Sequence, residues 1–156
     1  MLDGNVISAI LQSRDAYDKV RDYLHRDELS PEAQMWLPLI RGWYKADRRA
    51  TCVDTSLLVA KGERELPEAH VESLKSWLRD LPEIDSPLNV VTDLIELKRY
   101  VKGNELCQAI QGRDMRKVLP ILEEYSDLST ATTLGSSEIT WTMDDEEMDE
   151  TLDRNN

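Results

Sequence analysis

Apolar residues recur at helical spacing along most of the chain, and the longest such run lies between residues 87 and 128. One predicted helical face is marked by apolar residues at i, i+4, i+7 and i+11, namely Val90, Leu94, Leu97 and Val101. Ser86 followed by Pro87 is typical of a helix start, because a hydroxyl can cap free amides and proline suits the first helical position. A turn at Gly112–Asp114 then precedes a second apolar stripe, consisting of Met115, Val118, Leu119, Leu122 and Tyr125. The pattern predicts a helical hairpin, with Pro120 near the end of a short returning arm.

The first 86 residues carry shorter helical patterns, each with its own start signal. Helices are predicted at about residues 5–12, 13–24, 30–47, 54–60 and 67–81. Ser13, Ser30 and Asp54 are expected to cap three of them, since short oxygen-bearing side chains accept hydrogen bonds from the first amides of a helix. Pro38 is expected to kink or split the third helix, and the polar stretch Gly62–Leu66 is expected to form a turn. No segment alternates as a strand would, so no sheet is predicted.

The expected fold is therefore all-α, with three parts. They are a small helical bundle over residues 1–86, a protruding C-terminal helical hairpin over residues 87–128, and a flexible acidic linker or tail over residues 129–156. The hairpin has two interpretations: a helix pair of an ordinary core, or an assembly element that pairs with another subunit. In the second interpretation the self-association residues are Val90, Leu94, Leu97, Val101, Met115, Leu119 and Leu122. Leu94 and Val101 would then lie at a subunit interface.

Charge is unevenly distributed along the chain. The formal net charge is −12, but residues 126–156 hold nine acidic side chains and one basic side chain. The segment from 129 is too polar to offset the entropy of ordering, so we expect it to be disordered when alone. It is either a solvated linker or a docking peptide that binds a protein partner. The residues that would dock are Trp141, Met143, Asp144, Asp145, Glu146 and Glu147.

The familiar catalytic patterns are missing from the sequence. No glycine opens a Walker-type phosphate loop, and the chain's two histidines, His25 and His70, lie far apart with no zinc-binding spacing near them. Cys52 and Cys107 have no CxxC spacing and are expected to be small buried residues in a reducing compartment. We expect this chain to be non-catalytic, with no cofactor of its own.

Basic residues form two groups, and each group has acidic neighbours. One group is Arg41, Lys45, Arg48 and Arg49, and the other is Lys98, Arg99 and Lys102. Solvated helix surfaces of mixed charge are the simpler interpretation. A nucleic-acid interface would require the basic side chains to share one face.

Read in order, the elements resemble a known domain. The segments LQSRDAYDKVRDYLHRDEL (Leu11–Leu29) and WLPLIRGWYKADRRATCVDTSLL (Trp36–Leu58), followed by a further helix and a helical hairpin, are similar to the N-terminal domain of DnaB-type replicative helicases, especially those of bacteriophages. Tyr17 and Val20, the connector at Asp27–Leu29 and the pair at Val53–Asp54 stand where that family places comparable residues. The resemblance spans about residues 5 to 128.

The resemblance implies a role in DNA replication. Hairpins of neighbouring subunits in that family pack in pairs, which form a collar above a hexameric motor, and the collar docks primase or a helicase loader. ATP and Mg²⁺ would act in a following motor domain, which would make a longer parent an ATP-dependent helicase. This domain would meet DNA only indirectly. We expect homo-oligomers, no membrane contact and a cytoplasmic location in a bacterium or a phage-infected host.

An alternative hypothesis needs no helicase parent. A stand-alone acidic adaptor would bind a replication or host factor through its C-terminal tail, with Trp141 and the acidic run providing affinity and steering.

Overall fold

A computed structural model of the protein describes residues 2–131. Within that range the chain forms seven α-helices and two 3₁₀ turns, with no strand, so the predicted all-α class is confirmed. The chain divides into two compact units, Met1–Leu97 and Lys98–Asn156. The tail residues proposed for partner docking lie outside the described residues.

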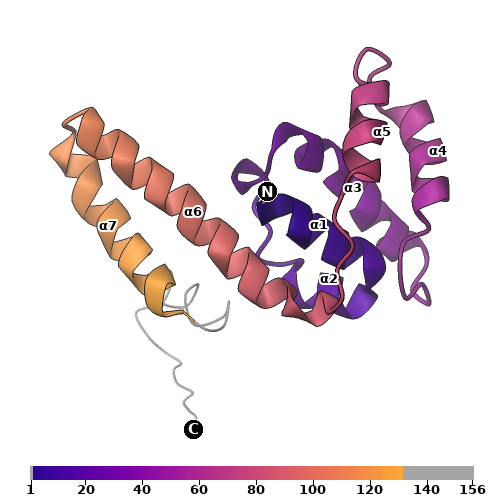
Figure 1. Cartoon of the computed structure of the whole chain (residues 1–156), viewed down its shortest axis with the longest axis horizontal. Helices are drawn as coiled ribbons and strands as arrows, with labels where there is room; N and C mark the ends of the chain where they lie inside the picture. The colour runs from indigo at the N-terminus through magenta and orange to yellow at the C-terminus, as the bar shows by residue number, and fades with distance from the viewer. Residues whose placement is uncertain (1, 132–156) are drawn as a thin grey trace, which may run out of the picture. The chain divides into compact units, whose positions relative to one another are not determined.

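The first unit is a bundle of short helices (Figure 1). Its elements are α1 (Leu2–Gln12), α2 (Arg14–Val20), η1 (Arg26–Glu28), α3 (Pro31–Ala46), α4 (Thr55–Glu65), α5 (Val71–Arg79), η2 (Pro87–Asn89) and the beginning of α6 (Val90–Gln111). Helix α1 contacts α2, α3 and η2, whereas α4 contacts both α3 and α5. The unit therefore extends beyond residue 86, where the sequence pattern placed the end of the bundle.

Three predicted caps are present. The side-chain oxygens of Ser13, Ser30 and Asp54 accept from the amides three residues later at 3.2, 3.4 and 3.3 Å. Ser86 makes no such bond, and η2 stands where the long helix was predicted to begin. Helix α3 continues through Pro38 without splitting.

Trp36 lies at the centre of the bundle, and the indole is fully buried. Its Nε1 donates to the carbonyl of Leu74 at 3.1 Å, which links α3 to α5. Gly62 faces the indole from α4, where a Cβ would lie only 2.7 Å from Cη2 of Trp36. The predicted turn at Gly62–Leu66 is wrong, because α4 continues to Glu65 and uses the glycine for close packing.

The beginning of α6 belongs to the core of the chain. Val90, Leu94 and Leu97 are buried, and Leu94 is fully inaccessible. The expectation that Leu94 faces another subunit is therefore wrong, and Val90 and Leu97 are equally unavailable as an exposed interface. Helical spacing correctly predicts that Val90, Leu94 and Leu97 share one face of α6. It does not show that this face is buried within the chain itself.

The second unit is a helical hairpin made by the rest of α6 and by α7 (Met115–Thr130). The predicted turn is present, and its left-handed residue is Arg113, with φ of 56°. Lys102 on α6 pairs with Glu124 on α7 at 3.1 Å. Pro120 lies inside α7, which continues beyond it to Thr130, so this proline does not end the returning arm.

Cys52 and Cys107 are both exposed free thiols, so the prediction that they are buried is wrong. Among the described helices, none is both long enough and apolar enough to cross a membrane.

Candidate functional site

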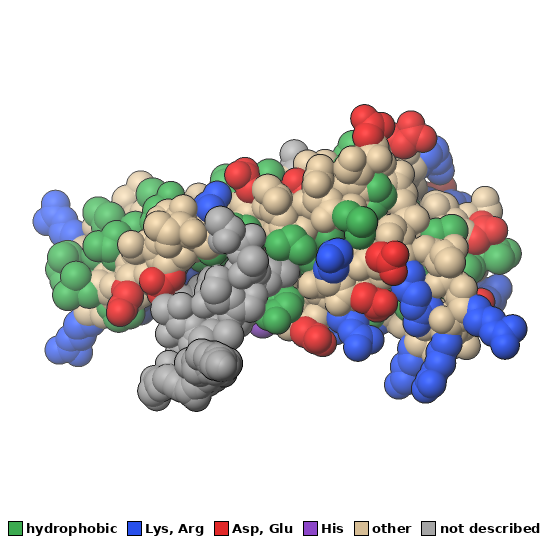
Figure 2. All heavy atoms as spheres, turned by 90° about the horizontal axis from the view of Figure 1, so that it is seen from below, with side chains coloured by type: hydrophobic (Ala, Val, Ile, Leu, Met, Phe, Trp, Pro, Cys, Tyr) green, Lys and Arg blue, Asp and Glu red, His purple; other side chains and the backbone are tan. Residues whose placement is uncertain are grey.

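Exposed apolar side chains are concentrated on the hairpin. Seven large hydrophobic side chains are exposed in the described chain, and five of them lie in the second unit: Tyr100, Ile110, Met115, Leu119 and Leu122. Figure 2 shows apolar side chains over the surface of this unit. The hairpin buries only three apolar side chains, those of Ala109, Val118 and Leu128. It therefore exposes more large apolar groups than it buries.

The exposed residues of α7 form one stripe. Met115, Leu119 and Leu122 fall at i, i+4 and i+7, so they share a helix face. Met115 is 64% exposed and Leu119 is 68% exposed. Val118 lies beside this stripe, three residues after Met115 and four before Leu122, yet it is buried, as is Leu128. The stripe thus continues the buried apolar face of α7 onto a part of the helix that the hairpin's own packing leaves exposed.

Charge is also ordered along α7. Arg116 and Lys117 lie in its first turn, whereas Glu123, Glu124 and Asp127 lie in its second half. Arg116 and Glu123 are seven residues apart and flank the same side of the apolar stripe. An antiparallel copy of α7 would bring opposite charges together at both ends.

The residues predicted for self-association thus separate into two sets. Met115, Leu119 and Leu122 are exposed in the second unit, where they lie on one face. Val101 is half-buried, and the three earlier residues of the stripe lie in the core. Self-association remains a prediction, now restricted to the hairpin.

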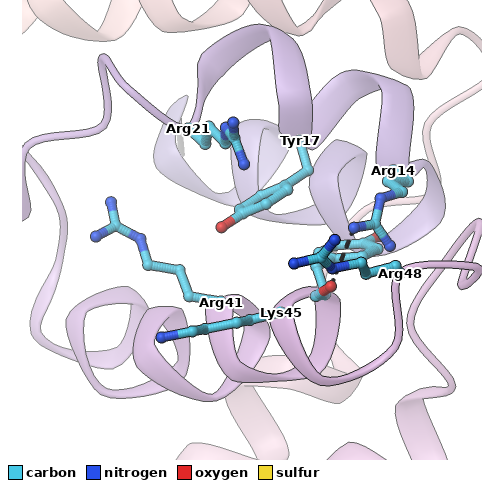
Figure 3. Close-up of a pocket in the computed structure, with 7 residues that line it drawn as sticks. Arg14, Tyr17, Arg21, Arg41, Lys45 and Arg48 are labelled. Carbon is cyan, nitrogen blue, oxygen red and sulfur yellow. Dashed lines mark hydrogen bonds between the residues drawn. The ribbon is translucent and has the colours of Figure 1, made fainter.

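A second candidate site lies in the first unit, between α2 and α3. Five cationic side chains line a pocket of about 660 Å³: Arg14, Arg21, Arg41, Lys45 and Arg48. Tyr17 and Tyr44 complete the lining, which includes no acidic side chain. Figure 3 shows the basic side chains projecting from both helices around a common space. We call this site the basic pocket.

Tyr17 and Tyr44 pack against each other at the base of the basic pocket. Their rings stack with centroids 4.7 Å apart, and the hydroxyl of Tyr44 donates to the carbonyl of Ile10 at 2.6 Å. Burial raises the pKa of the Tyr44 hydroxyl above its ordinary value, so this group stays protonated. The hydroxyl of Tyr17 points into the pocket (Figure 3).

The arginines differ in how much hydrogen-bonding capacity remains free. Arg14 donates to the carbonyls of Tyr44, Asp47 and Ala50 at 3.0, 2.7 and 3.1 Å, so its guanidinium holds the end of α3. Arg41 makes one long bond to the carbonyl of Leu24 at 3.4 Å.

Comparison with family models, curated proteins and solved structures finds no match to this chain.

Sequence reasoning named three of the five cations but missed their shared site. The spacing was visible: Arg14 and Arg21 are seven residues apart, and Arg41, Lys45 and Arg48 fall at i, i+4 and i+7. Helical periodicity places Arg41 and Lys45 on one face of α3, and Arg14 and Arg21 on one side of α2. Arg48 follows the end of α3 at Ala46, and the sequence does not show that these positions meet. Among residues 2–131, no group of three or more potential metal ligands is present.

Proposed function

We propose that this chain is a non-catalytic assembly module whose hairpin pairs with the hairpin of a second copy. Such pairing is the role that the resemblance to a DnaB-type helicase collar implies, in which paired subunits dock primase or a loader during replication. The proposal depends above all on one observation: the hairpin exposes five large apolar side chains and buries three.

The physical reason is that two helices alone form a small core. Most helix stability in proteins comes from packing an apolar face against a neighbour, and Met115, Leu119 and Leu122 have no such neighbour among the described residues. Burying one leucine side chain contributes about 1.5–3 kcal/mol. A second copy would cover this stripe with an identical one, as a two-fold interface requires.

The order of charges favours a second copy of the same chain as the occupant. In an antiparallel pair, Arg116 of each hairpin would approach Glu123 of the other copy. In a parallel two-fold pair, the flank that carries Arg116 and Glu123 would face the opposite flank of the copy, so these two charges would not meet. The surface is thus self-complementary in both hydrophobicity and charge.

Substitution of Leu119 tests the apolar part of the proposal. Leu119→Glu should weaken self-association by roughly 100- to 10,000-fold, because a two-fold pair loses one leucine from each copy, about 3–6 kcal/mol in all, and each 1.4 kcal/mol corresponds to tenfold. The measurement is sedimentation velocity over a wide range of protein concentration. Leu57→Glu is the matched control, because Leu57 is also exposed, at 57%, but lies on α4 in the first unit. The proposal fails if the unsubstituted chain stays monomeric at about 100 µM, or if both variants behave alike.

Charge reversal tests the identity of the partner. Arg116→Glu should weaken the dimer, and the double variant Arg116→Glu with Glu123→Arg should restore it. A different protein partner would not be expected to accept the double variant. Absence of restoration would contradict antiparallel pairing even if Leu119→Glu dissociates the protein.

A further inference from the structure

We propose that the basic pocket between α2 and α3 binds the sugar–phosphate backbone of a nucleic-acid strand. Five of the chain's 19 Lys and Arg residues line this one pocket, although the net charge of the chain is −12. Basic side chains on α2, on α3 and just after each helix therefore meet one requirement of a nucleic-acid interface, a common face. Figure 2 shows Lys and Arg side chains gathered on one part of the surface of the first unit.

The cations are available to a ligand to different degrees. Lys45 and Arg48 are exposed and make no hydrogen bond or ion pair with any described residue. Arg21 makes only a 4.0 Å contact with its neighbour Asp22, and both side chains are largely exposed. Such an exposed pair contributes little and exchanges readily for a stronger anion. Arg14 is held by backbone carbonyls, so it adds positive charge at the end of the pocket rather than free donors.

The chemistry of the lining favours phosphate over base recognition. Four of the five cations are arginines, whose planar donors match phosphate oxygens in a bidentate manner. Tyr17 as a residue is only 7% exposed and Tyr44 only 1%. Each ring has one face against the other ring, and so little of either residue is exposed that neither offers a second, free face for stacking a base. Binding through phosphates alone is independent of sequence.

The same burial argues against an acidic peptide as the ligand. Peptide docking sites obtain most of their affinity from a few apolar or aromatic anchors in desolvated contacts. The basic pocket is lined by no aliphatic residue, and its two tyrosines are almost wholly buried. Charge alone suffices for nucleic acid, since neutralised phosphates release condensed counterions. The ligand that this lining fits is therefore the phosphodiester backbone of a nucleic acid.

The test measures binding of the full chain to fluorescently labelled oligonucleotides by anisotropy, at about 50 mM salt. One arm uses an oligothymidylate of about 20 nucleotides, and the other uses a duplex of equal length. The double substitution Lys45→Gln with Arg48→Gln should lower the affinity for both oligonucleotides roughly tenfold. For the single strand, the slope of log K against the logarithm of the salt concentration should become shallower by about 1.4, because each of the two lost phosphate contacts contributes about 0.7.

The matched control removes the same charge from the same part of the chain. Lys19 lies on α2 and Arg49 follows Arg48, yet neither lines the pocket. Lys19→Gln with Arg49→Gln should change affinity less than about twofold and leave the slope nearly unchanged. Circular dichroism checks that both double variants retain their helix content.

Three results would overturn the proposal. The first is no binding of either oligonucleotide by the unsubstituted chain. The second is equal weakening by the two double variants, which would indicate diffuse attraction rather than a site. The third is competition by a poly-glutamate peptide as strong as that of unlabelled oligonucleotide, which would make the pocket a site for acidic proteins. Leu119→Glu should retain its intrinsic affinity for a short oligonucleotide, so the result does not depend on self-association.

Discussion

Gly62 provides a sharp test of the bundle's packing, because two opposing effects act at this residue. In an ordinary helix interior, replacing glycine by alanine stabilises the helix by about 0.5–1 kcal/mol, since glycine has more conformational freedom to lose. At Gly62, however, a Cβ would lie 2.7 Å from Cη2 and 2.8 Å from Cζ3 of Trp36, and 3.1 Å from Cδ1 of Leu66. Carbon atoms do not approach so closely without movement of the indole.

The indole has little room to move. Trp36 is fully buried, and its Nε1 is held by the carbonyl of Leu74. Overpacking a core of this kind costs about 1–3 kcal/mol. After subtraction of the propensity gain, Gly62→Ala should destabilise the first unit by about 0–2.5 kcal/mol, and the central value of about 1 kcal/mol corresponds to a fall in Tm of roughly 4–8 °C.

Gly42 is the matched control within the same bundle. It also lies inside a helix, α3, but the nearest atom to an added Cβ is Nζ of Lys61, at 3.8 Å. Since a flexible lysine can withdraw, Gly42→Ala should raise stability by about 0.5–1 kcal/mol. Urea and thermal unfolding followed by far-ultraviolet circular dichroism measure both changes. If Gly62→Ala stabilises the protein as Gly42→Ala does, the close packing of α4 against Trp36 is refuted.

Two further predictions concern charged side chains. Arg14→Lys keeps the charge but loses the guanidinium that donates to three carbonyls at the end of α3 at 2.7–3.1 Å. The free energy of unfolding, measured in urea, should therefore fall by about 1–2 kcal/mol. An unchanged free energy of unfolding would contradict a stabilising role for these hydrogen bonds. Burial lowers the pKa of Lys102, but Glu124 and Glu105 more than offset it, so the folded pKa lies above 10.5. The Lys102–Glu124 pair should therefore stabilise the hairpin fully below pH 10.5 and lose this contribution as pH rises through the folded pKa. A double-mutant cycle with glutamine substitutions should give a coupling of about 0.5 kcal/mol at pH 7 that disappears at strongly alkaline pH; a coupling that does not depend on pH would contradict this assignment.

Local signals predicted the parts of the fold that depend on local chemistry. Ser13, Ser30 and Asp54 cap helices because a short side-chain oxygen reaches the amides of the next turn whatever surrounds it. The hairpin turn at Gly112–Asp114 was visible for the same reason. The all-α class followed from helical spacing over nearly every segment.

Predictions that depended on distant neighbours were less successful. The polar sequence around Gly62 predicts a turn, although Trp36, 26 residues earlier in the sequence, makes a glycine necessary inside a helix. Ser86 before Pro87 predicts a cap, but the chain enters α6 through a 3₁₀ turn instead. The apolar neighbours of Cys107 predict a buried thiol, whereas this residue lies on an exposed part of the hairpin. In each case the local structure or burial depends on contacts with segments that are distant in the sequence, which local spacing does not show.

The long helix α6 shows why periodicity alone cannot assign an interface. Val90, Leu94, Leu97 and Val101 share one stripe, yet the first three are buried and the fourth is only half-buried. The chain divides into its two units after Leu97, so α6 contributes its beginning to the bundle and its remainder to the hairpin. The part within the bundle has neighbours enough to cover its apolar face, while the hairpin has only one other helix. The smaller core of the hairpin leaves the apolar stripe of α7 exposed, whereas Leu94 is fully buried. Substitution of Leu119 rather than Leu94 is therefore the test of the proposed self-association.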